Sequence, residues 1–208
     1  MRRLALTSIA ELCSLAMLAA TAAPAGAQGS AQVYRDPEKG LLVYVADLSG
    51  RQPGEVRVTY TSQVFWFFNP FNPLEPGFGC AFATPAFPHV AGCQQPVNGL
   101  LVQLGPGPND VKVLSSVPGL PGPNLIQGNR KVDQIQGGQN DEKINGGKGN
   151  DAIDPGPGND DVNAGPQNDK IDSRDGEPDK VNGGAGKRDE AKVDKQDRVK
   201  NVEVVKRK

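Results

Sequence analysis

The sequence predicts an all-β protein in which a small N-terminal β domain precedes a short parallel β-roll and a C-terminal cap strand. The first observation behind this prediction is an aliphatic residue at every ninth position: Ile126, Ile135, Ile144, Ile153, Val162 and Ile171. The second is that every aromatic residue of the 208-residue chain lies between Tyr34 and Phe87. A nine-residue period of turn residues around one aliphatic position is typical of solenoids with stacked parallel strands.

Residues 1–27 have the features of a secretory signal peptide. Arg2 and Arg3 give a positive start, an apolar run extends over about residues 12–23, and Ala25-Gly26-Ala27 supplies an A-x-A cleavage site. We therefore predict cleavage near Ala27 and a secreted protein. The run is too short to span a bilayer, and no later stretch approaches the roughly 18 apolar residues that a span needs, so no membrane span is expected. The arginine pair leaves the export route, general or twin-arginine, open.

Residues 28–118 are predicted to form a small β domain that a disulfide pins. Short apolar or alternating runs predict its strands, at residues 41–45, 56–60, 64–68, 100–104 and 111–114. Cys80 and Cys93 are the cysteines that remain after signal-peptide removal, and an even count in a secreted chain favours a disulfide. Such a bridge would contribute about 3 kcal/mol. Two buried thiols are the alternative.

The roll is predicted to occupy residues 119–190, followed by a cap and basic tail at residues 191–208. One repeat is complete, with the sequence GGKGNDAID at residues 146–154 and the pattern G-G-x-G-x-D-x-U-x. Six turn residues precede a three-residue strand, of which only the middle residue points inward. Two repeats therefore make one full coil, with a strand on each side. The resulting core is thin, so we expect a bound ligand to contribute to stability.

Calcium is the predicted ligand. A carboxylate or amide stands two positions before each aliphatic residue, and Ca²⁺ takes six to eight hard oxygen ligands from carboxylates and backbone carbonyls. Glycine permits positive φ, which lets a turn aim its carbonyls at one point. Because one coil spans two repeats, one edge carries Asp133, Asp151 and Asp169, and the other carries Glu142 and Asp160 with Asn124. The predicted metal-site residues are Asp133, Glu142, Gly146, Gly147, Gly149, Asp151, Gly156, Gly158, Asp160, Gly165 and Asp169.

This repeat resembles the hemolysin-type (RTX) calcium-binding nonapeptide family. The whole mature chain is similar to small secreted calcium-binding proteins of actinobacterial type, with residues 104–110 at the domain junction and residues 193–205 as the closing segment. The resemblance implies a parallel β-roll in which calcium binding is coupled to folding after export. We expect about two to four Ca²⁺ ions, each bridging turns that are two repeats apart.

Several turns depart from the repeat pattern. Lys131, Asn140 and Gln167 stand at the position that Gly149 has in the complete repeat, prolines enter three turns, and Lys143, Lys148 and Lys170 add positive charge near the sites. The period also slips after residue 172, because Asp179 and Asp189 each follow at an interval of ten. The best sites should therefore lie around Asp151, Asp160 and Asp169. A flexible tail with accidental periodicity and a roll that no longer binds calcium are the alternatives.

The remaining residues argue against other function classes. The formal net charge of −1 gives no nucleic-acid signal. His89 is the single histidine and the mature chain has no expected free thiol, so no catalytic triad, Cys-His pair or zinc site is predicted, and no enzyme. The alternative function is an extracellular adhesion or interaction module with the roll as a spacer. In that case Phe65–Phe71 or the basic tail would contact a cell surface or polymer, although the aromatic segment fits a β-domain core equally well.

Overall fold

The computed structural model describes residues 31–36, 41–45, 54–61, 64–69, 74–77, 80–82, 90–94, 99–104, 109–114 and 124–208, and these contain strands and no helix. The N-terminal strands are β1 (Ala31–Arg35), β2 (Leu41–Val45), β3 (Gly54–Thr61), β4 (Val64–Phe68), β5 (Leu74–Pro76), β6 (Cys80–Phe82), β7 (Val90–Gln94), β8 (Gly99–Gln103) and β9 (Asn109–Leu114). The C-terminal strands are β10 (Asn124–Gln127), β11 (Asp133–Gln136), β12 (Glu142–Asn145), β13 (Ala152–Asp154), β14 (Asp161–Gly165), β15 (Lys170–Ser173), β16 (Lys180–Gly184), β17 (Glu190–Val193), β18 (Arg198–Lys200) and β19 (Val204–Arg207). The all-β prediction is confirmed.

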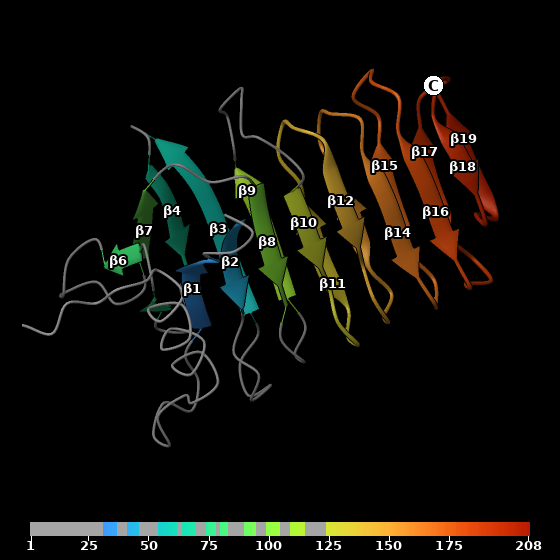
Figure 1. Cartoon of the computed structure of the whole chain (residues 1–208). Helices are drawn as coiled ribbons and strands as arrows, with labels where there is room; N and C mark the ends of the chain where they lie inside the picture. Colours follow the sequence, from blue (N-terminus) through green and yellow to red (C-terminus); the bar gives the residue numbers. More distant parts are fainter. Residues whose placement is uncertain are drawn as a thin grey trace, which may run out of the picture.

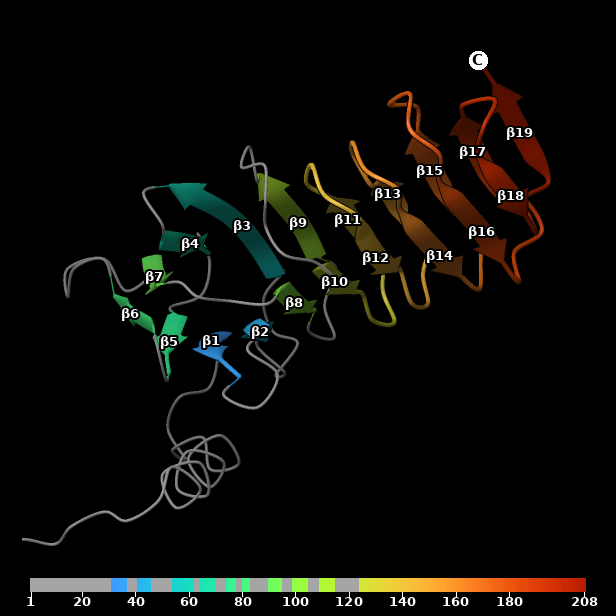
Figure 2. The same cartoon turned by 45° about the horizontal axis from the view of Figure 1, so that its top comes forward.

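Successive strands of the C-terminal half alternate between two sheets. One sheet has the order β18-β16-β14-β12-β10-β8-β2-β1-β5 and the other has the order β19-β17-β15-β13-β11-β9-β3-β4-β7-β6. Figures 1 and 2 show the two sheets as the two walls of a solenoid that the turns connect at either edge. Ile126 aligns with Ile144, and Ile135 aligns with Ile153, in parallel pairs. One coil therefore spans two repeats, as the nine-residue period predicts.

Side chains alternate along each roll strand as a two-residue period requires. In β13, Ile153 is buried between the exposed residues Ala152 and Asp154. The same alternation buries all six aliphatic residues of the nine-residue period, each at most 3 % exposed. These side chains form two facing columns inside the roll. Most roll strands bury one aliphatic residue, while β14 also buries Ala164 and β17 buries both Ala191 and Val193.

Both sheets of the roll continue into the N-terminal half. β8 pairs in parallel with both β10 and β2, and β9 pairs in parallel with both β11 and β3. The inward column runs from Ile126 through Val102 to Tyr44 without a break. The register of β9 places Asn109, rather than Asp110, beside Asp133. The two predicted regions therefore share one pair of sheets and one hydrophobic core.

The N-terminal end of the solenoid changes to antiparallel pairing. β4 pairs antiparallel with β3 and β7, and β7 with β6. Cys80 and Cys93 are directly opposed in the β6–β7 pair and form a disulfide, which confirms that prediction. Phe67 is fully buried, with its ring stacked 6.2 Å from the ring of Tyr44, whereas Phe68 is 37 % exposed. The aromatic segment thus contributes at least Phe67 to the core.

The C-terminal end consists of two strands where the sequence suggested one. β18 extends the first sheet and β19 extends the second. Val199 and Val202 pack partly buried against the core, while Val204 and Val205 remain 45 % and 40 % exposed.

The residues added to the nine-residue period lie in the turns and leave the strand pairing intact, since Val181 still pairs with Val162 and Ala191 with Ile171.

Some predictions lie outside the described residues. These are the signal peptide with its cleavage near Ala27, His89, Phe71, and the side chains of Phe65 and Trp66. Within the part that the structure describes, no helix is long and apolar enough to cross a membrane.

Candidate metal sites on the two edges of the roll

Two rows of buried acidic side chains run along the edges of the roll. Each member is the last residue of a turn, immediately before or at the start of a strand, and its side chain turns inward beside the aliphatic column. The buried acidic residues, each at most 5 % exposed, are Asp133, Glu142, Asp151, Asp160, Asp169, Asp179, Asp189 and Asp197. Burying an ionised carboxylate is costly unless it is paired or coordinates a metal. The partners of these oxygens therefore decide what the rows can bind.

On the edge that leads into the second sheet, three successive carboxylates each accept a hydrogen bond from the coil before them. The amide of Asp133 donates to Oδ1 of Asp151 (2.9 Å), the amide of Asp151 to Oδ1 of Asp169 (2.8 Å), and the amide of Asp169 to Oδ1 of Asp189 (2.9 Å). One oxygen of each of these three carboxylates thus joins two stacked coils. The predicted row of Asp133, Asp151 and Asp169 lies on one edge in the structure.

The opposite edge repeats this arrangement. The amide of Glu142 donates to Oδ1 of Asp160 (2.7 Å), and the amide of Asp160 donates to Oδ1 of Asp179 (2.8 Å). The amide of Asp179 in turn donates to Oδ1 of Asp197 (3.0 Å). At the start of this row the Asn124 side chain donates to Oε1 of Glu142 at 3.0 Å. Glu142, Asp160 and Asn124 therefore share an edge, as their spacing predicts.

The second carboxylate oxygen differs between members of the same row. Among the described residues, the buried Oδ2 atoms without a hydrogen-bond donor include those of Asp151, Asp160, Asp169, Asp179 and Asp189. Buried polar atoms in proteins normally have a partner, and an oxygen without one marks a place for a water or an ion. Five successive carboxylates with the same free oxygen form a repeated candidate cation site.

Protein donors satisfy the carboxylates at three of the four row ends, and Asp189 is the exception. The Asn129 amide and side chain donate to the carboxylate of Asp133, and the amide of Gly138 donates to Oε2 of Glu142 (2.9 Å). Asp197 accepts hydrogen bonds on Oδ2 from the Ser173 hydroxyl (3.2 Å) and the amide of Asp194 (2.7 Å). The predicted ligands Asp133 and Glu142 therefore differ from the central members of their rows, because both of these carboxylates are held by donors from their own turns.

Burial also perturbs the protonation of these groups. Desolvation raises the pKa of Asp151 to about 6, of Asp169 to about 7 and of Asp179 to about 7. The pKa of Glu142 rises to about 7, and that of Asp160 to about 8, for the same principal reason. In each case neighbouring carboxylates add to the effect and backbone hydrogen bonds oppose it in part. Burial therefore disfavours the ionised form of these five groups, and a bound cation would favour it.

The glycine turns bring backbone carbonyl oxygens to the same space. Gly147 has φ of +97° and Gly149 has φ of +147°. A Cβ on Gly149 would lie 2.1 Å from the Lys131 carbonyl oxygen and 2.8 Å from Oδ1 of Asp151. Carbonyls of one coil therefore approach the carboxylate of the next, which supplies the mixed oxygen donors that Ca²⁺ prefers. The other predicted glycines, Gly146, Gly156, Gly158 and Gly165, also approach an oxygen of a neighbouring coil.

The departures from the repeat affect the turns unequally. Gln167 keeps a left-handed backbone, with φ of +81°, although it lacks the freedom of glycine. Its side-chain oxygen accepts a hydrogen bond from the amide of Gly149 at 2.8 Å. Lys131 and Asn140 do not have positive φ, so their turns follow a different course. These are the turns before Asp133 and Glu142, whose carboxylates are satisfied by protein donors.

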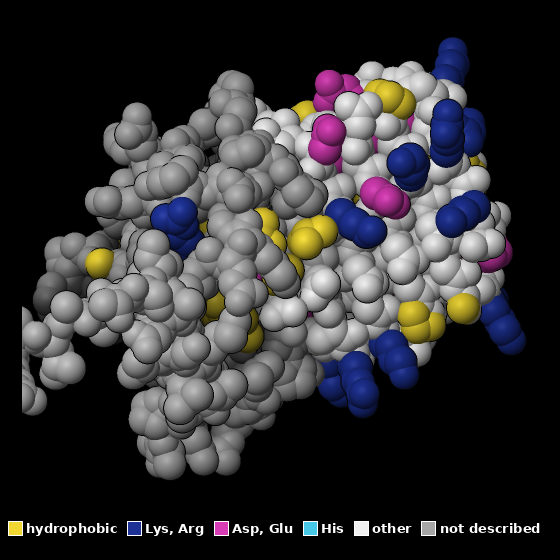
Figure 3. Space-filling view, viewed as in Figure 1, with side chains coloured by type: hydrophobic (Ala, Val, Ile, Leu, Met, Phe, Trp, Pro, Cys, Tyr) yellow, Lys and Arg dark blue, Asp and Glu magenta, His cyan; other side chains and the backbone are white. Residues whose placement is uncertain are grey.

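Basic side chains near the rows point away from them. Lys143 and Lys170 are exposed on the outer faces of β12 and β15, and Lys148 is exposed in its turn. Figure 3 shows lysine and arginine side chains spread over the surface of the C-terminal half, where few acidic side chains are visible. The positive charge that the sequence placed near the sites therefore does not neutralise the buried carboxylates by contact.

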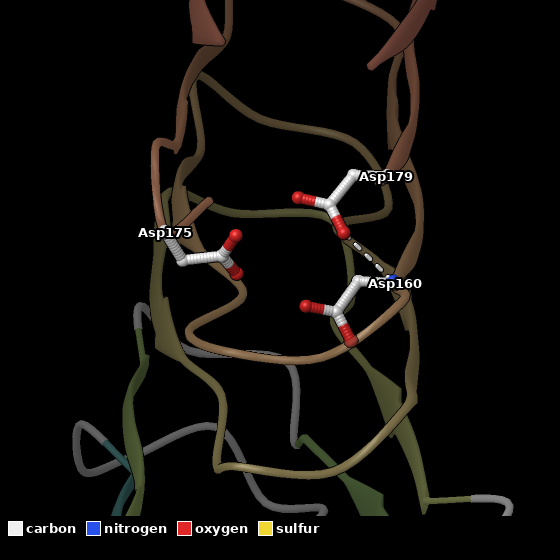
Figure 4. A group of neighbouring side chains, drawn as sticks. All are labelled: Asp160, Asp175 and Asp179. Atoms are coloured by element: carbon white, nitrogen blue, oxygen red, sulfur yellow. Dashed lines mark hydrogen bonds between the residues drawn. The ribbon is translucent and has the colours of Figure 1, made fainter. Parts of the chain in front are cut away.

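A group of three aspartates stands out on the edge that leads into the first sheet. One carboxylate oxygen from each of Asp160, Asp175 and Asp179 lies within 4.8 Å of the others (Figure 4). The sequence prediction included only Asp160. A strict nine-residue template misses Asp179, although its position two residues before Val181 repeats the aspartate-to-aliphatic spacing. Asp175 has no counterpart in the repeat pattern.

The comparison with known families agrees with this geometry. Residues 118–153 and 154–187 match the family model described as RTX calcium-binding nonapeptide repeat (4 copies). Residues 118–187 are RTX calcium-binding repeats. The RTX match covers the coils whose turns carry Asp133 to Asp179, and residues 1–117 and 188–208 lie outside it. No curated protein and no solved structure matches the chain.

Proposed function

We propose that this protein is a secreted calcium-binding protein whose β-roll folds around Ca²⁺ ions that bridge turns one coil apart. The observation that carries the proposal is the double use of each central carboxylate. In Asp151 and Asp169, for example, Oδ1 accepts an amide from the preceding coil and the buried Oδ2 has no donor. A cation at Oδ2 would satisfy that oxygen and offset the charge. The RTX repeats, the solenoid and its acidic rows support a calcium-binding β-roll.

The chemistry of the donors favours calcium over other metals. Every cysteine and the one histidine precede residue 94, so the roll offers oxygen donors and none of the nitrogen or sulfur ligands that zinc and copper prefer. Magnesium requires a compact octahedral shell and retains its waters, whereas Ca²⁺ accepts six to eight oxygens in irregular geometry. Carboxylates together with turn carbonyls suit the second description. We propose about two to four ions, without assigning each to a turn.

Calcium binding would be coupled to folding. Without a cation, each central coil buries a carboxylate oxygen that has no donor, next to a thin aliphatic core. A cation that binds the folded state and not the unfolded chain shifts the equilibrium toward the roll. Low calcium inside the cell would leave the roll unfolded for export, and calcium outside would fold it. The secretion step of this proposal rests on the predicted signal peptide at residues 1–27.

A calcium titration of residues 28–208 tests the proposal. We expect urea unfolding, followed by far-ultraviolet circular dichroism, to require more denaturant in calcium than in chelator. A site with Kd of about 10⁻⁴ M, at the tight end of the extracellular range, would contribute about 2.7 kcal/mol at a hundredfold excess. Magnesium at the same ionic strength is the control. Identical unfolding curves in calcium and in chelator would contradict the proposal.

We also propose that the protein has no enzymatic activity. RTX calcium-binding repeats typically have a structural role. The oxygens of the rows are already explained by stacking and by cation binding, so none of them needs a catalytic role. The adhesion alternative keeps less support, because Phe67 from the aromatic segment lies in the core.

A further inference from the structure

We propose that Asp160, Asp175 and Asp179 form a three-carboxylate calcium site that binds more tightly than the other positions along the two edges. This inference rests on the proposed function, since it assigns one particular site within the roll. Its new element is Asp175, a carboxylate from the interior of a turn rather than from the row that recurs in every coil.

The turn that carries Asp175 is longer than its counterpart in the preceding coil. Along this edge the amide of Glu142 donates to Asp160, 18 positions ahead, whereas the amide of Asp160 donates to Asp179, 19 positions ahead. Because Ile153 still pairs with Ile171, the added residue lies between β15 and β16. The corresponding segment of the preceding coil contains Pro157 and Gly158, which have no carboxylate to offer. The added residue that breaks the nine-residue period therefore lies in the same turn as an additional acidic side chain, which faces the row.

Each of the three carboxylates is held by a backbone amide and keeps one oxygen free. Oδ1 of Asp175 accepts the amide of Glu177 (2.7 Å), just as Oδ1 of Asp160 and Oδ1 of Asp179 accept amides within their row. The three Oδ2 atoms are buried and have no donor, and Asp160 and Asp179 are each only 1 % exposed. Figure 4 shows the three carboxylates turned toward one another.

The spacing suits one calcium ion. Ligand oxygens within 4.8 Å of one another need at most a small side-chain movement to lie at a Ca²⁺–O distance of about 2.3–2.6 Å from a common centre. Of the residues that the structure describes, no other three acidic groups bring ligand atoms this close. On the opposite edge, Asp151, Asp169 and Asp189 follow one another in a row, and no described turn adds a further carboxylate within that distance.

The charged groups around this site favour a cation. The adjacent basic residue, Arg174, turns away and binds Asp172 through two hydrogen bonds of 2.7 Å. The charged groups that act on the three aspartates are themselves acidic, namely Glu142, Glu177, Asp194 and Asp197. Ligand charge is one of the properties that set calcium affinity in proteins. We therefore expect this site to bind about tenfold more tightly than the sites with two carboxylates.

Isothermal titration of calcium into residues 28–208 and their Asp175→Asn variant tests the inference. The amide of asparagine retains the acceptor for Glu177 but removes the charge. The matched control is Asp161→Asn, which removes a carboxylate from the exposed face of β14 in the same coil. We expect the wild-type protein to show one tighter class of binding that Asp175→Asn weakens about tenfold and Asp161→Asn preserves. Asp179→Asn should weaken the same class.

Stability without calcium gives an independent readout. If Asp175 acts as a ligand, Asp175→Asn will raise the urea midpoint in chelator, by removing repulsion, and lower it in calcium. A purely structural role would lower both midpoints. Superposable calcium titrations of wild type and Asp175→Asn would overturn the three-carboxylate site and leave the proposed function standing. A wild-type protein that binds no calcium would overturn the proposed function and this site together.

Discussion

The backbone amide of Asp151 donates a hydrogen bond to Oδ1 of Asp169, 2.8 Å away in the following coil, and Oδ2 of Asp169 is left buried without a donor. One side chain thus performs two tasks. Its first oxygen holds the two coils in register, and its second is the proposed ligand for a cation between them. The register and the candidate binding site therefore depend on the same residue. A substitution that preserves the first oxygen while removing the charge separates the two tasks.

Asp169→Asn should weaken calcium binding while the fold persists. Asparagine keeps Oδ1 as an acceptor for Asp151, but it loses the charge at the position of Oδ2. We expect calcium affinity to fall by about tenfold and stability in chelator to rise. Asp133→Asn is the matched comparison, because Asn129 already donates to that carboxylate. Calorimetry of both variants measures the difference, and equal losses would show that the free oxygen does not mark the sites.

A pair of glycine substitutions tests how closely the turns stack. Gly147 and Gly176 have nearly the same φ, of +97° and +99°. A Cβ on Gly147 would lie 2.1 Å from the Asn129 carbonyl oxygen, whereas a Cβ on Gly176 would meet nothing within 4 Å. We expect Gly176→Ala to cost about 1 kcal/mol, the usual penalty for a left-handed backbone.

Gly147→Ala should cost at least about 2 kcal/mol more, because the coils must also separate. Urea unfolding of both variants in saturating calcium measures the two losses of free energy. Similar losses would mean that the coils stack less closely than the structure shows.

The sequence predicted the roll well because its geometry is periodic. A nine-residue interval places Asp151, Asp160 and Asp169 in their rows without any knowledge of the rest of the fold. Asp179 and Asp189 were missed because one added residue shifts each of them out of a strict template, while the sheets tolerate the insertion within a turn. Asp175 could not be predicted, since its role depends on the course of an irregular turn.

The N-terminal half was predicted less completely for a physical reason. β5 and β6 are short, and β5 ends in Pro76, so neither shows a recognisable alternation. The continuity of the sheets was also missed. Val111 pairs with Ile135, but their separation in the sequence differs from the two-repeat interval. That interval is the signal by which the other coils can be recognised. Long-range pairing without a repeat gives no local signal in the sequence.

Removal of the disulfide tests whether the two halves are energetically coupled. The bridge joins cysteines 13 residues apart, and its loss should destabilise the N-terminal strands by about 3 kcal/mol. In a solenoid each coil is stabilised by its neighbours. Because β8 and β9 pair directly with β10 and β11, we expect Cys80→Ser/Cys93→Ser to speed hydrogen exchange in β10 and β11 more than in β17. Unchanged exchange in β10 and β11 would indicate two independent units.

The stability of the metal-free protein should fall as the pH rises from 5 to 8. Burial raises the pKa of Asp160 to about 8 and of Asp169 to about 7, above the ordinary aspartate value of 3.8. In this range the folded protein binds more protons than the unfolded chain, so protonation stabilises the fold and the benefit is lost as these groups ionise. We expect a loss of at least about 1.4 kcal/mol, which corresponds to one pKa unit in one group.

Calcium should reverse this trend, since ionised carboxylates bind the cation and protonated ones do not. Urea unfolding at pH 5, 6, 7 and 8, in chelator and in calcium, measures both dependences. The curves should diverge with rising pH, because stability falls in chelator while the increment due to calcium grows. Asp169→Asn is the control, and its stability in chelator should depend less on pH than that of the wild type. A metal-free protein that is more stable at pH 8 than at pH 5 would show that the buried carboxylates are neutralised by groups within the protein.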